Sequence, residues 1–192
     1  MYLASHNSWS YLKPKKWWMK LIRFTAQCQD VDIKTQYEKY GVRCFDLRLR
    51  LNKSGELKIV HGIVEYDYTY DNLKQDLEYL NNCKDCYIRM IHDVRTKKEY
   101  TILALAWFKC YCAKFKNTFP NITFWCGENL YTHTKDYHFG PDLACEEKYA
   151  SVRKPKLIDD WYPKLYAYFN NKKNIKKGTD KQFLMIDFIN YA

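Results

Sequence analysis

The stretch "YGVRCFDLRLRL", residues 40–51, decides the fold because it predicts a long β-strand with two chemically different sides. One side carries Val42, Cys44, Asp46, Arg48 and Arg50, and the other carries Arg43, Phe45, Leu47, Leu49 and Leu51. Strict alternation of this kind has the period of a strand and not that of a helix. The glycine at position 41 closes the helical pattern that precedes it.

Strand-like and helix-like segments alternate along the rest of the chain. Apolar runs predict strands at residues 2–5, 57–62, 86–93, 122–128 and 182–191. Helical spacing predicts helices at residues 32–41, 69–82, 99–117 and 157–172. Strands that alternate with helices indicate a parallel sheet with helices outside it. We therefore expect an α/β fold, a TIM-type (β/α) barrel, formed by residues 1–192 as a single domain.

Polar side chains cluster where several of these strands end. His6 follows the first strand, Asp46 and Arg48 lie on the second, and His61 ends the third. Because the carboxyl ends of barrel strands meet on one face, these groups are expected to converge. Two histidines can serve as base and acid in one turnover, and an arginine fork between them can neutralise phosphate oxygens. The set suits a phosphodiester substrate.

Four segments carry a resemblance to a known family. "ASHNS" (4–8) resembles the Gly-Thr-His-Asp-Ser segment of the phosphatidylinositol-specific phospholipase C catalytic domain, and residues 40–51 resemble its Gly-x-Arg-x-x-Asp-x-Arg strand. "IVHG" (59–62) is similar to the strand with the second histidine, and "CEEKYAS" (145–151) to an Asp-Lys-Tyr segment. The resemblance covers most of residues 1–150 and is closest to the bacterial, single-domain, metal-independent branch of these phospholipase C-like phosphodiesterases.

The resemblance implies a catalytic role for five residues. His6 would be the general base that deprotonates the inositol 2-hydroxyl, and His61 the general acid that protonates the departing diacylglycerol oxygen. Arg48 would lie against the phosphate, with Asp46 orienting it. Asn7 stands where the bacterial branch has an aspartate that supports the general acid. The implied reaction is that of a lyase, which releases a cyclic inositol phosphate.

Three further residues are implied to bind the substrate. Glu147 stands in place of the aspartate that holds the inositol ring, and Tyr149 would border that ring. His92 lies where the bacterial branch carries a lysine that contacts the substrate; an ordinary strand-end histidine is the equal alternative.

Asn7 also raises the question of calcium, because the calcium-dependent branch binds its metal through an asparagine at this position. Calcium prefers several hard oxygen ligands, mostly carboxylates. Arg48 and His92 stand where that branch supplies acidic ligands. We therefore expect no metal cofactor, with calcium the less favoured alternative.

The carboxyl-terminal end allows two interpretations, because a full barrel usually takes about 250 residues. By its distance from residues 145–151, the strand in 182–191 is the seventh, and the eighth, which carries the aspartate supporting the general base, is missing. By its own pattern it is the last strand of a shortened barrel, with Asp187 as that aspartate. The first interpretation, a short or incomplete barrel, is favoured, and it allows for an inactive relative of the family.

The net charge of +10 points to an anionic partner. Trp17 and Trp18 lie among lysines in "YLKPKKWWMKLIRF" (11–24), a composition typical of transient contact with an anionic membrane surface or, equally, of an amphipathic helix packed on the barrel. A phosphoinositide or related anionic lipid is the expected partner, nucleic acid is not, and the chain is expected to be a monomer. The sequence as given begins without a basic-then-apolar leader, so its localisation stays open.

Two rival functions and one alternative site remain. The first rival is an enzyme of the same barrel that cleaves glycerophosphodiesters, which would need a metal held by carboxylates. The second is a catalytically impaired barrel that only binds anionic lipid or inositol phosphates. The eight cysteines include the spacing Cys83-x-x-Cys86, but the pairing needed for a structural zinc site is poor, and buried free thiols are the better interpretation.

Overall fold

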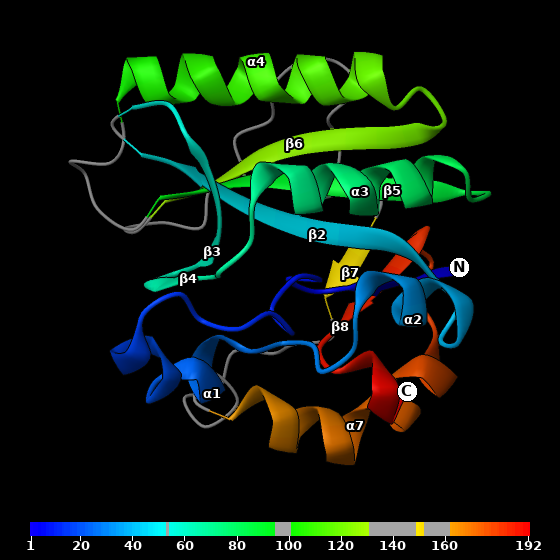
Figure 1. The fold of residues 1–192 in the computed structure, drawn as a ribbon. Helices are drawn as coiled ribbons and strands as arrows, with labels where there is room; N and C mark the ends of the chain where they lie inside the picture. The colour runs from blue at the N-terminus through cyan, green and yellow to red at the C-terminus, as the bar shows by residue number, and fades with distance from the viewer. Residues whose placement is uncertain (53, 95–100, 131–148, 152–161) are drawn as a thin grey trace.

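The computed structural model describes residues 1–52, 54–94, 101–130, 149–151 and 162–192. These parts form one sheet with helices on its outside (Figure 1). None of the described helices is long and apolar enough to cross a membrane.

Six strands of the sheet run parallel. In their order across the sheet they are β6 (Ile122–Leu130), β5 (Cys86–Val94), β2 (Val42–Leu51), β1 (Tyr2–Ser5), β8 (Phe183–Ile186) and β7 (Tyr149–Ser151). Within the described parts of the chain no pairing joins β6 to β7. The predicted barrel is therefore confirmed as a parallel sheet with outer helices, and not as a closed ring.

The position of β8 corrects the favoured prediction for the carboxyl-terminal end. β8 pairs along its whole length with β1, from Tyr2 opposite Phe183 to Ser5 opposite Ile186, and with β7 on its other side. In a barrel the strand beside the first one is the last one. The strand at Phe183–Ile186 thus takes the place of the last strand, as in the second interpretation. It does not fit the favoured interpretation, in which this strand is the seventh and the eighth is missing.

The third strand also departs from the expected parallel pattern. β3 (Leu57–His61) runs antiparallel to the end of β2, with Leu49 opposite Ile59, and pairs in turn with β4 (Val64–Glu65). β3 is a return strand and not a further parallel barrel strand. It carries His61 back toward the body of the sheet.

The helices lie in two groups around the sheet (Figure 1). The group drawn toward the top is α3 (Tyr70–Asn81) and α4 (Ile102–Thr118), and the group drawn toward the bottom is α1 (Arg23–Ala26), α2 (Ile33–Glu38) and α7 (Pro163–Lys177). Hydroxyl and carboxylate side chains begin three of them: Asp32, Thr69 and Thr101 each accept a hydrogen bond from the backbone N–H three residues later. The remaining short elements are the 3₁₀ turns η1 (Trp17–Lys20) and η2 (Ile189–Tyr191).

The two sides of each strand pack differently. On β2, Phe45, Leu47 and Leu49 belong to the large hydrophobic core between sheet and helices. On the inner side, Cys44 joins a small apolar cluster with Ala4, Trp125, Phe183 and Met185. The predicted alternation is thus confirmed. The small inner cluster lies below the charged residues that follow Cys44 on the same side.

Candidate active site

Three parallel strands bring the site residues together. On the inner side of β2, Asp46 and Arg48 follow Cys44. His6 and Asp187 lie just past the ends of β1 and β8, each two positions after an apolar residue of the inner cluster. Period-two alternation explains this arrangement, since residues two apart on a strand share one face. The chain's first and last strands therefore meet at one cluster of polar groups.

His6 is held between a carboxylate and a guanidinium. Its Nδ1 lies 2.6 Å from Asp187 Oδ1, and its Nε2 lies 2.7 Å from an Arg48 nitrogen. A guanidinium can only donate and a carboxylate can only accept. In the neutral form of this imidazole the proton is therefore on Nδ1, and the lone pair is on Nε2. This is the tautomer that a general base needs.

Asp46 is the buried anchor of the cluster. Its side chain is fully buried and accepts from Arg48 Nε at 2.9 Å, Arg89 at 3.1 Å and the backbone N–H of Asn7 at 3.0 Å. Burial alone would raise the pKa of Asp46, but the Arg48 and Arg89 guanidiniums hold it well below its usual range. Burial would lower the pKa of Arg48, yet Asp46 outweighs it and the pKa is raised. Arg48 is thus fixed and charged beside His6.

His61 faces His6 across the site. The two rings are nearly perpendicular, with centroids 5.6 Å apart. His61 Nδ1 lies 2.7 Å from the carbonyl oxygen of Ala26, which also accepts a longer hydrogen bond of 3.4 Å from the side chain of Asn7. The Ala26 carbonyl therefore orients Nδ1 of the second histidine, and Asn7 shares that acceptor.

Burial, the positive charge of Arg48 and the neighbouring His6 lower the pKa of His61 from 6.5 to about 4. His61 is therefore neutral near pH 7 in the absence of a ligand. The Arg48 guanidinium therefore lowers the pKa of the Asp46 carboxyl and of the His61 imidazole alike, since a positive charge favours the deprotonated form of each.

A set of hydrogen bonds braces the turn after His61. Gly62 has a positive φ of 55°, a backbone conformation that favours glycine, and its N–H donates to the Asp93 carboxylate at 2.9 Å. Arg50 on β2 donates to the carbonyl oxygens of Asp93 and Gly62. Asp93 thus connects the β3–β4 hairpin to β5.

The low pKa of His61 predicts a pH-dependent stability. Between pH 6.5 and about 4 the unfolded chain gains a proton at this position that the folded chain does not take up. The free energy of unfolding should therefore fall as the pH falls through this range. Urea denaturation at pH 7 and pH 5 should show a larger loss for the native chain than for His61→Gln; equal losses would contradict the prediction.

Three predicted substrate contacts have different outcomes. His92 is 1 % exposed and stacks on Phe108 of α4, with ring centroids 5.0 Å apart. It lies on the helix side of β5, which fits the alternative of an ordinary strand-end histidine and not the predicted contact with the substrate. Its neighbour Asp93 lies on the inner side of β5, because successive residues of a strand face opposite sides of the sheet. Glu147 lies outside the described residues, and for Tyr149 only the backbone, in β7, is described.

Sequence reasoning missed three residues of the cluster. Arg89 contacts Asp46, Gln29 donates to the carbonyl oxygens of His6 and Ile186, and the Cys28 sulfur lies 4.0 Å from His61 Nδ1. Arg89 could have been found, because in parallel strands an inward Asp46 pairs with an inward residue on β5. Cys28 and Gln29 lie in an irregular segment after α1, where spacing gives no signal.

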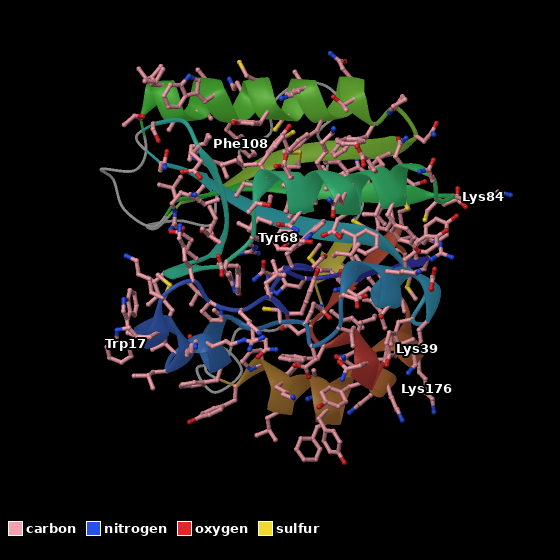
Figure 2. All side chains as sticks on the ribbon, viewed as in Figure 1. Trp17, Lys39, Tyr68, Lys84, Phe108 and Lys176 are labelled. Carbon is pink, nitrogen blue, oxygen red and sulfur yellow. The ribbon has the colours of Figure 1, made fainter. Side chains whose placement is uncertain are left out.

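Trp17 and Trp18 lie apart from this cluster, on η1. Trp17 is 74 % exposed and Trp18 is 37 % exposed. Figure 2 shows Trp17 projecting from the edge of the molecule. The buried residue of η1 is Met19. The alternative of one amphipathic helix with both tryptophans packed on the barrel does not fit.

Comparison with known proteins finds likeness at the level of structure. No protein-family model and no curated protein sequence matches the chain. A double mutant of the phosphatidylinositol-specific phospholipase C from Staphylococcus aureus matches with a TM-score of 0.63 at 17 % identity, covering 97 % of this chain and 84 % of that one.

Two other structures of that S. aureus enzyme agree. A single mutant matches with a TM-score of 0.62 at 15 % identity, over 97 % of this chain and 84 % of that one. A structure described as concerning modulation of the enzyme's membrane binding gives 0.60 at 16 % identity, over 97 % and 85 %. At these identities the likeness establishes the fold and not the reaction. The chain has the fold of the phosphatidylinositol-specific phospholipases C.

Proposed function

We propose that this protein is a phosphodiesterase of the phospholipase C type, which cleaves phosphatidylinositol or a close relative at the bond between glycerol oxygen and phosphorus. The observation that carries the proposal is the arrangement of two histidine rings 5.6 Å apart, with Arg48 hydrogen-bonded to one of them. A phosphate between the rings would contact a base, an acid and a cation at once. The fold likeness supports the same reaction class.

In the proposed reaction, His6 Nε2 takes the proton of the inositol 2-hydroxyl. The hydroxyl oxygen attacks phosphorus in line, and the bond from phosphorus to the glycerol oxygen breaks. His61 gives its proton to that oxygen. The products are diacylglycerol and a cyclic inositol phosphate, and the two histidines together have moved one proton from one oxygen to the other.

Substrate binding has to rearrange one contact. In the free site the lone pair of His6 Nε2 accepts from Arg48 at 2.7 Å, so the base is occupied. A phosphate oxygen is a stronger acceptor for a guanidinium than an imidazole is, and Arg48 can donate to it bidentately. When the substrate binds, this Arg48 N–H would donate to the phosphate in place of His6, and the lone pair of His6 Nε2 would become available as the base.

Binding of the substrate phosphate would also favour protonation of His61, the proposed acid. His61 is neutral in the free site because its pKa is about 4. A phosphate anion beside it favours the imidazolium and raises this pKa. Catalysis with His61 as acid thus depends on the substrate's own charge to supply what the neutral Asn7 does not.

The described residues fit calcium poorly as a cofactor. Asn7 Oδ1 is buried and has no hydrogen-bond partner among the described residues, which suits an oxygen ligand. But both Asp46 oxygens accept from Arg48, Arg89 or Asn7, and the Arg48 guanidinium lies beside them. Calcium needs several free carboxylate oxygens. The proposed reaction therefore uses the arginine as its cation.

Phosphorus NMR of the full chain with phosphatidylinositol vesicles and EDTA tests the proposal. We expect a cyclic inositol phosphate signal. The absence of product from folded protein that still binds the vesicles would overturn the catalytic proposal and favour a lipid-binding barrel. Activity that needs added calcium would overturn the metal assignment. Cleavage of glycerophosphoinositol but not of phosphatidylinositol would favour the rival glycerophosphodiester reaction.

We also propose transient contact of this protein with an anionic membrane. Phe24 is 47 % exposed and stacks on Tyr162 at 5.9 Å, close to α1 and the start of α7, so the exposed aromatic surface extends beyond Trp17. Lysines in the surrounding sequence add attraction to anionic headgroups.

Trp17→Ala should weaken binding to phosphatidylinositol-containing vesicles by about tenfold, since burying a large apolar side chain is worth about 1.5–3 kcal/mol and about 1.4 kcal/mol is tenfold. Vesicle sedimentation measures the effect. Tyr79→Ala, a substitution of a partly buried tyrosine on α3, serves as the control and should bind like the native chain. Unchanged binding by Trp17→Ala would exclude Trp17 from the contact.

A further inference from the structure

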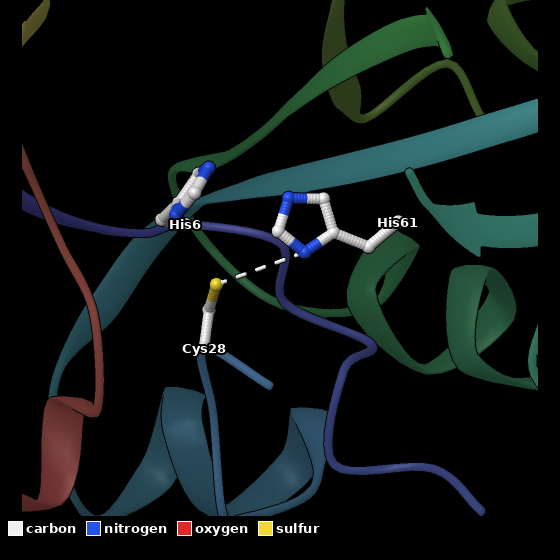
Figure 3. A group of neighbouring side chains, drawn as sticks. All are labelled: His6, Cys28 and His61. Atoms are coloured by element: carbon white, nitrogen blue, oxygen red, sulfur yellow. Dashed lines mark hydrogen bonds between the residues drawn. The ribbon is translucent and has the colours of Figure 1, made fainter. Parts of the chain in front are cut away.

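A buried thiol points into the space between the two histidines. Figure 3 shows the sulfur of Cys28 below the rings of His6 and His61, with the dashed line joining it to His61 Nδ1 at 4.0 Å. One donor atom from each of the three side chains lies within 4.8 Å of the other two. The proposed phosphodiester reaction gives Cys28 no task.

The backbone of Cys28 is held from both sides. Its N–H donates to the Ser10 hydroxyl at 2.9 Å, and its carbonyl accepts from the Phe188 N–H at 2.5 Å. Ser10 Oγ also accepts from the N–H of Gln29 at 2.9 Å. The residue is fully buried. The thiol is therefore preorganised toward the histidines from a fixed part of the fold.

Two nitrogens and one sulfur form the donor set that zinc prefers. Zinc–nitrogen bonds of about 2.0–2.1 Å and zinc–sulfur bonds of about 2.3 Å place tetrahedral donors about 3.3–3.6 Å apart. The observed separations are somewhat larger, so side-chain rotations would draw the three atoms onto one ion. Three protein ligands leave a fourth position for water. Calcium, by contrast, has little affinity for this set.

The surrounding charges can accommodate such an ion. Asp187 and Asp46 lie within 2.6 Å and 3.9 Å of His6 nitrogens, and zinc binding turns Cys28 into a thiolate. These negative charges offset the electrostatic repulsion between the zinc ion and the Arg48 guanidinium. His6 retains 16 % exposure of its side chain, which gives the site access to solvent.

We propose that His6, Cys28 and His61 form a zinc-binding site that, if the proposed function is right, switches the enzyme off. The ion would occupy a nitrogen lone pair of each histidine, and these are the groups that move the proton in the proposed reaction. Binding through His61 Nδ1 would also replace the hydrogen bond of that nitrogen to the Ala26 carbonyl. Binding through His6 would displace its contact with Asp187 or with Arg48. Zinc is here an inhibitor and not a cofactor.

Titration of the full chain with ZnCl₂ against a chromophoric chelator tests the site without reference to activity. Cys28→Ser should lose affinity by more than about tenfold, because even the partners of zinc ligands contribute about 10–100-fold. The matched control is Cys110→Ser, which removes an exposed thiol on α4 and should bind zinc like the native chain. Affinity should also fall from pH 8 to pH 6, since protons compete for sulfur and nitrogen.

CoCl₂ in place of zinc should give a thiolate-to-cobalt absorption band that Cys28→Ser lacks and Cys110→Ser keeps. If melting in EDTA shows Cys28→Ser to be unfolded, His61→Gln carries the comparison of zinc affinity instead. Equal zinc affinity in the native chain and the tested variant, or an equal loss in Cys110→Ser, would overturn the proposal.

The phosphatidylinositol assay separates this proposal from the proposed function. Product that forms in EDTA, disappears when the EDTA is removed and one equivalent of ZnCl₂ is added, and returns when EDTA is restored supports both. Product that persists when zinc is bound through Cys28 would overturn the inhibitory role. No product in EDTA, with zinc still bound through Cys28, would overturn the proposed function and leave the metal site standing.

Discussion

His6→Ala should lower the turnover of phosphatidylinositol by about 10²–10⁴-fold, the usual contribution of one positioned acid or base. The variant loses the imidazole ring that Asp187 holds in the base tautomer through Nδ1 at 2.6 Å. His61→Ala should lose a similar factor. Release of labelled inositol phosphate measures both rates.

A second substitution separates catalysis from loss of structure. Asp187→Asn can donate its amide N–H to His6 Nδ1, which would place the ring proton on Nε2 and remove the base. Turnover should fall as in His6→Ala, whereas vesicle binding should stay at the native level in both variants. Turnover within threefold of native in His6→Ala would show that the base lies elsewhere.

Asp46→Ala should lower the free energy of unfolding by about 3–5 kcal/mol, because it leaves buried positive charge without its partner. Asp46 is fully buried between Arg48 and Arg89, and its carboxylate binds both. Urea denaturation near pH 7 measures the change. Asp180→Ala, which removes an exposed carboxylate before β8, should change the free energy by less than about 0.5 kcal/mol.

The double variant Asp46→Ala/Arg89→Met gives the prediction a sharper form. Asp46→Ala removes the carboxylate that pairs with two buried cations, Arg48 and Arg89. Arg89→Met removes one of these cations. The double variant should therefore be more stable than the sum of the two single losses indicates. Additive losses would mean that the carboxylate and Arg89 do not interact.

The sequence predicted most of this fold because its hydrophobic pattern is local. The alternation in residues 42–51 established β2 and its inward charges, and helical spacing located α3 and α4. The partners of strands depend instead on distant pairing. That is why the place of β8 beside β1, and the antiparallel return of β3, could only be seen in the structure.

The site could be predicted where strand periodicity governs direction. His6, Asp46 and Arg48 lie together as expected, and His61 does too, although an unexpected hairpin brings it there. His92 failed because position 92 faces the helices while position 93 faces inward, a difference of one residue in register. Cys28 and Gln29 could not be found, since irregular segments carry no period.

The pairing of β1 with β8 has a consequence for how this chain folds. His6 and Asp187 are 181 residues apart in the sequence. Contacts of such long range are slow to form, because the entropy of closing a large loop must be overcome first. During synthesis His6 emerges from the ribosome long before its carboxylate partner has been made. The proposed base therefore gains its carboxylate partner only after residue 187 has been made and β8 has paired with β1.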